Sequence, residues 1–171
     1  MPEENDPNLQ NIVVRIGDGA ILAKSHGSYW SIGTKIAKAQ VSAAWSPDSR
    51  IAVKVEQRAG SASAELFAFL DDDKVIGPFE LVDLLKPALL AKMQNATDAG
   101  DYSLLFFSHP AMTIDNQGRI HVIVCAVAKQ NMQDGPHYEA TMRVTRANNA
   151  LAVEIDSLTP YTGVTISIIV H

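Results

Sequence analysis

Hydrophobic and polar residues alternate in short runs along most of this chain, and turn-forming residues separate the runs. Alternation with a period of two, bounded by Gly, Pro, Asn and Asp, is typical of antiparallel β-strands. Four runs lie between residues 38 and 81, and a second series lies between residues 102 and 156. The pattern predicts an all-β fold with two four-stranded antiparallel sheets.

The two ends of the chain carry further strand-like runs. Three short runs near the start predict a small meander: Asn11–Ile16, Ala20–Ser25 and Ser28–Gly33. The turn-forming stretch GDG separates the first run from the second, and HG separates the second from the third. A last apolar run covers Val164–Val170, and we expect the terminal strands to complete a sheet edge. The polar, acidic residues 1–10 predict a flexible tail, and residues 11–171 have the length of a single β domain.

One segment departs from the strand pattern. Between Glu80 and Asn95, five leucines fall near helical spacing, which predicts a short helical insertion between the two sheets. Pro87 lies in the middle of this segment, and a proline inside a helix removes a backbone hydrogen bond. We therefore expect a short helix, or two helical turns divided near Lys86.

The two strand series contain an internal repeat. The stretch WSPDSRIAVKVEQ aligns with TIDNQGRIHVIVCA, so that the turns bearing Asp48 and Asp115 coincide and Arg50-Ile51 matches Arg119-Ile120. Each stretch is followed by a further pair of strands. Such self-similarity predicts stacked or radial sheets, with repeats over about residues 40–79 and 103–156.

The phrase AWSPDSRIAV resembles the first hairpin of a β-propeller blade of the WD40-like or TolB type, and IDNQGRIHV is similar to it. In such a turn Pro47 fixes φ and Asp48 bonds to backbone N–H groups. The resemblance implies propeller-like sheets, with Trp45 buried against a neighbouring sheet. Complete propellers have about four to eight blades. Two blades cannot close a ring, so their exposed faces need cover from the terminal strands, a second copy or another protein.

Charge and apolar runs narrow the classes of partner. The net charge is −5 and no cluster of Lys and Arg is visible, which argues against a nucleic-acid partner. The apolar runs are shorter than a membrane-spanning helix, so we expect no membrane insertion. The first residues have neither a basic region nor an apolar run, so we expect no signal peptide there. We expect a cytoplasmic protein, or a periplasmic one if an N-terminal signal has been removed.

No motif of catalysis or metal binding stands out. The acidic turn Asp71–Asp73 and the group Asp115, Asn116 and Gly118 lack the full spacing of a calcium loop. The five histidines form no zinc pattern, and no GxSxG elbow is present. Cys125 lies in an apolar strand, where burial is the usual outcome. We therefore predict no catalytic residue, no metal and no cofactor.

Two polar loops are better candidates for recognition, because loops on a rigid scaffold commonly carry binding residues. They span Met93–Ser103 and Lys129–Tyr138. The candidate partner-binding residues are Tyr102, Ser103, Met132, Asp134, His137 and Tyr138.

These observations favour a non-catalytic protein-binding module. The size, the Trp-Ser-Pro-Asp motif and the lack of catalytic residues resemble the periplasmic immunity proteins that block type VI secretion amidase effectors. That resemblance implies a protruding loop in an enzyme cleft, and a net negative charge suits a basic toxin. One alternative is a hydrolase or carbohydrate-binding protein with a pocket between the sheets near Asp48, Asp115 and His121. Another is a homodimer whose two halves complete a propeller.

Overall fold

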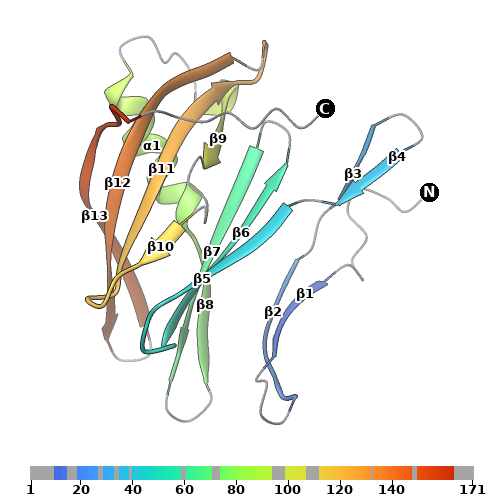
Figure 1. Cartoon of the computed structure of the whole chain (residues 1–171), viewed down its shortest axis with the longest axis vertical. Coiled ribbons are helices and arrows are strands. Elements are labelled where there is room, and N and C mark those ends of the chain that lie inside the picture. The colour runs from blue at the N-terminus through green and yellow to red at the C-terminus, as the bar shows by residue number, and fades with distance from the viewer. Residues whose placement is uncertain are drawn as a thin grey trace.

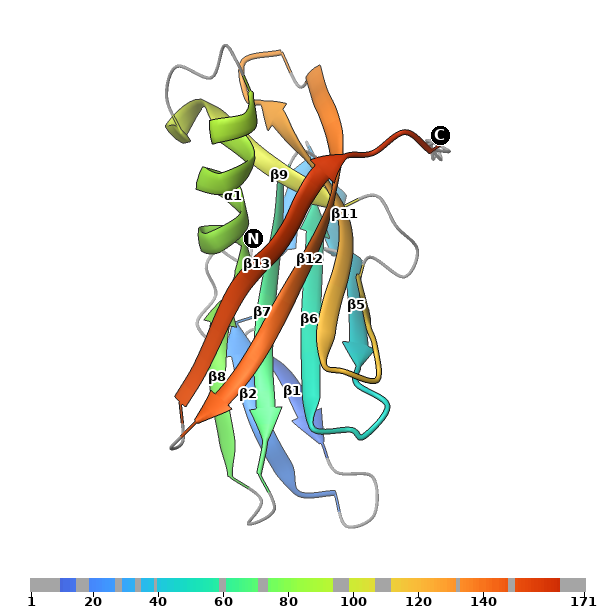
Figure 2. The same cartoon turned by 90° about the vertical axis from the view of Figure 1, so that its left-hand side faces the viewer.

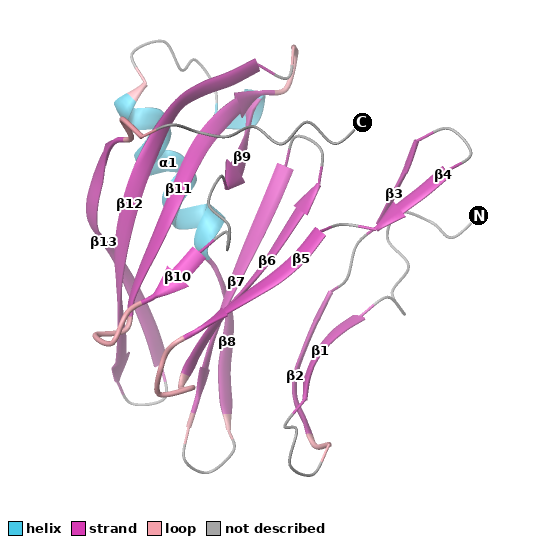
Figure 3. Cartoon of the chain, viewed as in Figure 1, coloured by secondary structure: helices cyan, strands magenta, loops and turns pink. Residues whose placement is uncertain are grey.

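The computed structural model describes residues 10–14, 19–26, 29–32, 35–38, 40–58, 61–70, 74–93, 99–106, 112–131, 133–147 and 150–163. Strands make up most of these residues, and they are accompanied by a single α-helix and a short 3₁₀ helix (Figure 3). The predicted all-β class with a helical insertion is confirmed.

The first sheet is a four-stranded antiparallel meander, as the alternation predicts. Its strands are β5 (Gln40–Trp45), β6 (Ile51–Arg58), β7 (Ser61–Phe69) and β8 (Val75–Glu80), in that order. Side chains alternate across it: Ile51, Val53 and Val55 of β6 enter the core, and the residues between them face the opposite side. The first strand-rich repeat therefore forms one continuous sheet.

The second sheet has five strands where four were predicted. Its members are β9 (Tyr102–Phe106), β10 (Met112–Ile114), β11 (Arg119–Ala128), β12 (Gln133–Ala147) and β13 (Ala150–Pro160). The run YSLLFFSHPAMTI, Tyr102 to Ile114, has the apolar composition of one strand, but its described residues form two strands, β9 and β10. Both pair with the same edge of β11, because Phe106 lies opposite Val124 and Met112 lies opposite Val122.

The two sheets face each other and share one hydrophobic core (Figure 2). Equivalent strands meet at their margins, since β5 lies beside β10 and β8 lies beside β13. Fully buried side chains from both sheets, such as Leu66 and Met142, meet in this core. The resemblance to propeller blades stays a prediction, because stacked antiparallel sheets occur in several β architectures.

The helix α1 (Leu81–Lys92) is continuous, so of the two predicted forms the short helix is confirmed and the division near Lys86 is not found. Its buried leucines pack into the shared core: Leu81, Leu85, Leu89 and Leu90. Pro87 is exposed, and the carbonyl that it leaves without an intrahelical partner belongs to the exposed Asp83. Because the side that lacks this hydrogen bond faces solvent, packing of the leucine face is sufficient to keep the helix continuous.

The start of the chain forms two separate hairpins and not the predicted meander. One consists of β1 (Gln10–Val14) and β2 (Ile21–His26), and the other of β3 (Tyr29–Ile32) and β4 (Lys35–Lys38). Among the described residues, β1 pairs only with β2, so it does not complete an edge of either large sheet. Figure 1 shows the β1–β2 hairpin on the side away from the five-stranded sheet. Residues 1–9 and Val164–Val170 lie outside the described residues.

Several strands are longer than their patterns predict. The strand β7 begins at Ser61, inside the stretch AGSAS, whose small residues predict a break between strands. The strand β13 continues to Pro160, inside the stretch SLTPYTG, whose composition predicts a loop. The prediction for Trp45 is also wrong. Its side chain is 46% exposed and stacks on Phe69 of the same sheet, with ring centroids 5.2 Å apart. Register places Trp45 opposite Ala52, which points away from the shared core.

Candidate functional site: the pocket between two repeated turns

The turn between β5 and β6 is built around a buried serine. The Ser49 N–H donates to the Ser46 carbonyl at 2.8 Å, and Ser49 has a φ of 59°. The Ser46 Oγ accepts from the N–H of Ile51 at 2.9 Å and lies 2.6 Å from Asp48 Oδ1, to which it donates. Pro47 suits the first central position, where φ is negative. The Ser-Pro-Asp-Ser sequence thus specifies a rigid turn.

The turn between β10 and β11 has the same construction with other residues. The Gly118 N–H donates to the Asp115 carbonyl at 3.0 Å, and Gly118 has a φ of 73°. The Asp115 Oδ1 accepts from the N–H groups of Gln117 at 2.8 Å and Arg119 at 2.9 Å. A side-chain oxygen at the first residue and a positive φ at the fourth are therefore common to both turns.

This correspondence corrects one detail of the sequence alignment. The structural counterpart of Asp115 is Ser46, and not Asp48. Asp48 occupies the position of Gln117 within its turn, where it accepts from Ser46 Oγ and from the Arg50 N–H at 3.1 Å. The paired residues Arg50-Ile51 and Arg119-Ile120 do follow the two turns in the same way.

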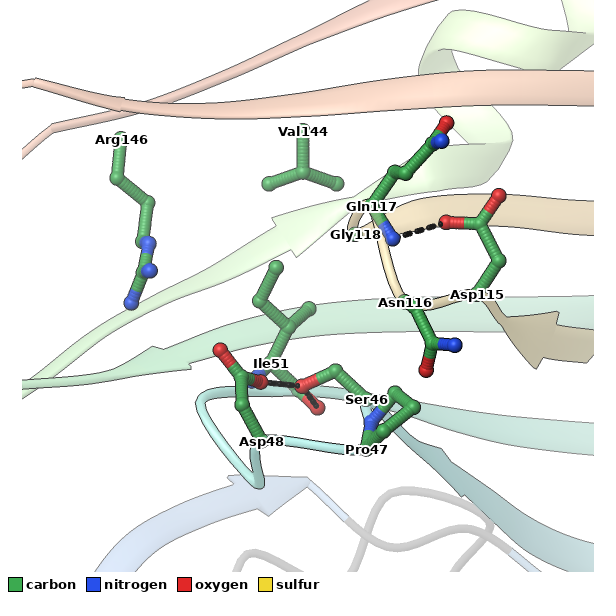
Figure 4. A pocket seen from close by; sticks show the side chains of 10 residues that line it. All are labelled: Ser46, Pro47, Asp48, Ile51, Asp115, Asn116, Gln117, Gly118, Val144 and Arg146. Atoms are coloured by element: carbon green, nitrogen blue, oxygen red, sulfur yellow. Dashed lines mark hydrogen bonds between the residues drawn. The ribbon is translucent and has the colours of Figure 1, made fainter.

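The two turns converge on one pocket of about 500 Å³ (Figure 4). They come together because β5 lies beside β10 at the margin of the stacked sheets. The pocket is lined by Ser46, Pro47, Asp48, Ile51, Asp115, Asn116, Gln117, Gly118, Val144 and Arg146. Ile51 and Val144 supply apolar surface, whereas both turns and Arg146 supply polar groups. This volume lies within the range of about 300 to 1,000 Å³ that is usual for ligand sites.

Both carboxylates of the pocket are held in the ionised form. The backbone N–H of Arg119 and the ring of His121 lower the pKa of Asp115 from 3.8 to about 2. The Ser46 hydroxyl and the Arg50 N–H lower the pKa of Asp48, and the positive charge of Arg146 adds to this effect. The pocket therefore presents two negative charges near neutral pH, and the guanidinium of Arg146 also lines it.

His121 supports the second turn from outside the pocket. Its Nε2 lies 3.1 Å from Asp115 Oδ2, and its Nδ1 lies 3.3 Å from the hydroxyl of Thr141 on the neighbouring strand. A hydroxyl, an imidazole and a carboxylate also line up in nucleophilic hydrolases. Here, however, neither His121 nor Thr141 lines the pocket.

The predicted recognition loops are mostly strands. Lys129–Asn131 form a tight turn and β12 begins at Gln133, so the prediction of a long loop over Lys129–Tyr138 is wrong. Tyr102 and Ser103 likewise belong to β9, where Ser103 pairs with Val127. The alternation in this region is obscured by polar residues on the solvent side, which made these strand ends look like loops.

The structure gathers most of the predicted partner-binding residues at one end of the five-stranded sheet. Asp134 pairs with Val127 from the other side, so Ser103 and Asp134 flank the same residue of β11. His137 is partly exposed, whereas Tyr138 is 7% exposed and belongs to the core, which leaves little of it for a partner. Met132 lies outside the described residues. These residues lie at the far end of β11 from the pocket, and their contact with a partner stays a prediction.

Other candidate chemistry is sparse in the part of the chain that the structure describes. Those residues include no group of three or more His, Cys, Asp and Glu side chains arranged to hold a metal ion. The acidic turn Asp71–Asp73 lies outside them. Cys125 is buried, and burial raises its pKa to about 12. Among the described helices, none is long and apolar enough to cross a membrane.

The chain matches no protein-family model, no curated protein and no solved structure.

Proposed function

We propose that this chain is a non-catalytic binding module that recognises a partner protein through the pocket between its two repeated turns. The observation that carries the proposal is the convergence of two Asp-bearing turns, which belong to different sheets, on one pocket of about 500 Å³. A site assembled from both halves of a repeat is held by the stacking of the sheets, so it is preorganised for binding.

The chemistry of the pocket suits a long cationic side chain. Ile51 and Val144 offer apolar surface for the aliphatic stem of a lysine or arginine, and Asp48 offers a charge for its head group. Asp48 is exposed, so it is accessible to a partner. The net charge of −5 adds a long-range attraction to a basic partner. In its most specific form, the proposal is an immunity protein whose pocket receives a basic segment of a toxin enzyme.

The ionisation of the pocket argues for binding over hydrolysis by a carboxylate pair. Such hydrolysis needs one carboxyl group that stays protonated near neutral pH so that it can act as an acid. The pKa values of Asp48 and Asp115 are both lowered, so both groups are charged there. Binding of a sugar is the second candidate, because Asp48, Asn116 and Gln117 present hydrogen-bonding groups around the same pocket.

Peptide binding by two variants, one that removes a negative charge from the pocket and one that removes a positive charge, tests the proposal. Synthetic peptides of equal length with a central Lys-Arg, Glu-Glu or Ser-Ser pair are titrated into isotope-labelled protein and followed by NMR. We expect the basic peptide to shift signals of both turns, Asp48→Asn to weaken its binding several-fold, and Arg146→Gln to strengthen it. Glu154→Gln, an exposed carboxylate on the outer side of β13, is the matched control and leaves affinity unchanged.

The outcomes separate the candidates. If the basic peptide shifts neither turn, or if Asp48→Asn binds it as well as the parent, the polypeptide-binding proposal is wrong. An oligosaccharide mixture titrated in the same way reports on the second candidate, because shifts of both turns with sugar and not with peptide would favour it.

A further inference from the structure

The β5 edge of the four-stranded sheet lacks the usual features that protect a sheet edge. Edge strands of natural proteins are usually kept from pairing with other chains by charges, prolines, bulges or very short length. The edge strand β8 contains Pro78 and an irregularity in its pairing with β7, β13 carries Glu154 and Asp156, and β10 has three residues. The edge strand β5 reads QVSAAW and has none of these features. The edge strand β9 has none either, but it lies beside β7 of the other sheet.

The backbone of β5 leaves hydrogen-bonding groups available along this edge. Among the described residues, β5 pairs only with β6. The Ser46 N–H donates to the Ile51 carbonyl, and bonded pairs alternate along an antiparallel ladder. Counting back from Ser46, the groups of Val41, Ala43 and Trp45 point away from β6. These three residues present three N–H and three C=O groups in a row.

The side chains of the same residues add apolar surface. Val41 is 49% exposed and Trp45 is 46% exposed. Register places both on the face of the sheet opposite the core, and Ala43 lies exposed between them. The other exposed large apolar side chains among the described residues are Ile12, Val14 and Ile21, all on the β1–β2 hairpin. Figure 1 shows this hairpin on the same side of the molecule, away from the five-stranded sheet.

We infer that β5 is a self-association edge, at which two copies of this chain pair antiparallel about a two-fold axis at Ala43. In this register Ala43 lies opposite its own copy and Trp45 lies opposite Val41, a cross-strand aromatic–aliphatic pair that contributes to sheet stability. No charged residue of β5 meets a like charge, because the strand contains none. The two four-stranded sheets then form one continuous sheet.

A second copy fits this edge better than a charged partner does. The strand supplies no ionic group to attract one, whereas it is complementary to itself in length, polarity and shape about Ala43. The net charge of −5 on each copy opposes association at long range. Salt screens this repulsion, so the dimer gains affinity as ionic strength rises. Binding of a basic partner in the pocket has the opposite dependence on salt, so the two sites are distinguishable.

Substitutions at Ala43 test the edge without disturbing the β5–β6 ladder, because its N–H points outward. Mass in solution is measured by light scattering from low micromolar to millimolar concentration. We expect the parent chain to form a dimer that strengthens with salt. Ala43→Pro, which removes the central donor, and Ala43→Lys, which opposes two like charges, reduce the dimer to a trace. Ala43→Ser is the matched control and keeps it.

A cross-link gives an independent readout that does not depend on affinity. Cα atoms of a directly opposed, hydrogen-bonded pair lie about 5.5 Å apart, which suits a disulfide. We expect Ala43→Cys to form a covalent dimer under mild oxidation, and Ala152→Cys, an exposed position on β13, to form none at the same concentration. A parent chain that stays monomeric throughout, a dimer that survives Ala43→Lys, or equal cross-linking at both positions would overturn the inference.

Discussion

Ser46 and Asp115 lie 69 positions apart, yet each accepts a hydrogen bond from the backbone N–H of the arginine that ends its turn. The distances are 3.2 Å from Arg50 to Ser46 Oγ and 2.9 Å from Arg119 to Asp115 Oδ1. A hydroxyl in one turn and a carboxylate in the other thus serve as the same kind of local acceptor. Because the two turns line one pocket, the shape of the pocket depends on both oxygens.

Removal of the serine hydroxyl is expected to destabilise the fold. Ser46 is 4% exposed, and its Oγ accepts hydrogen bonds from two backbone N–H groups. The donors are Arg50 at 3.2 Å and the buried Ile51 at 2.9 Å. Loss of a buried acceptor costs about 1 to 3 kcal/mol. We expect Ser46→Ala to lower the free energy of unfolding by that amount in urea titrations. Ser157→Ala, at an exposed position on β13, is the control, and equal losses in the two variants would contradict the role of Ser46.

The contribution of Asp115 is expected to depend on pH. Its folded-state pKa of about 2 lies below the unfolded value of 3.8, so ionisation favours the folded state. The stabilisation is complete above about pH 4 and is lost as the pH falls towards 2. We therefore expect the stability gap between the parent and Asp115→Asn to close over that window. A gap that stays constant in urea titrations from about pH 5 to about pH 2.5 would contradict this assignment.

The strands of the two large sheets are predictable because their burial alternates. In β6 the side chains of Ile51, Val53 and Val55 are buried in the core, and this burial of every second residue produces the period of two in the sequence. The pattern does not predict strand boundaries that are determined by tertiary contacts. The run from Tyr102 to Ile114 is apolar enough for one strand, but its two described parts pair separately with β11, with Phe106 opposite Val124 and Met112 opposite Val122. No local signal marks that division.

The pocket is a property of the packing of the sheets and not of any one motif. Its turns are visible in the sequence, and Asp48 and Asp115 were placed near a pocket between the sheets as one hypothesis. Val144 and Arg146 reach it from β12, whose sequence carries no sign of that position. Sequence reasoning also treated the start of β12 as a loop, because polar residues fill the solvent side of a long strand there.

The uninterrupted helix makes a prediction about Pro87. This residue is exposed inside α1 and supplies no N–H for the carbonyl of Asp83. Alanine restores that donor, although it also makes the unfolded chain more flexible, which offsets part of the gain. We expect Pro87→Ala to raise the free energy of unfolding by about 1 to 2 kcal/mol in urea titrations. Lys86→Ala is the neighbouring control, and a Pro87→Ala variant no more stable than this control would contradict the argument.

Glu80 caps the same helix at an energetic cost that depends on pH. Its carboxylate accepts from Val82 N–H at 3.1 Å and from Ala64 N–H at 2.8 Å, while burial raises its pKa above 4.5. A raised folded-state pKa favours folding below the unfolded value, and this advantage is lost as the pH rises through the folded value. We therefore expect Glu80→Gln, which keeps an acceptor without the charge, to gain stability relative to the parent as the pH rises above about 4.5.

Alanine at the same position separates the cap from the charge. Glu80→Ala leaves both N–H groups without this acceptor, so we expect a loss of about 1 to 2 kcal/mol near neutral pH. Two results would contradict this account of Glu80. One is an equal change in the free energy of unfolding for Glu80→Gln and Glu80→Ala near neutral pH, and the other is a stability advantage of Glu80→Gln that does not grow with pH.

Cys125 provides a probe of whether the described core opens as a unit. The side chain is fully buried, and burial, with a smaller contribution from the charge of Asp134, raises its pKa to about 12. Because the thiolate is the reactive form, two barriers act together, low access and a low thiolate fraction. We expect an aromatic disulfide reagent to modify the native protein near pH 8 far more slowly than the urea-unfolded chain. The rate should rise with urea in parallel with the loss of β signal in circular dichroism. Rapid modification in the absence of urea would show that the outer side of β11 opens locally while the rest stays folded.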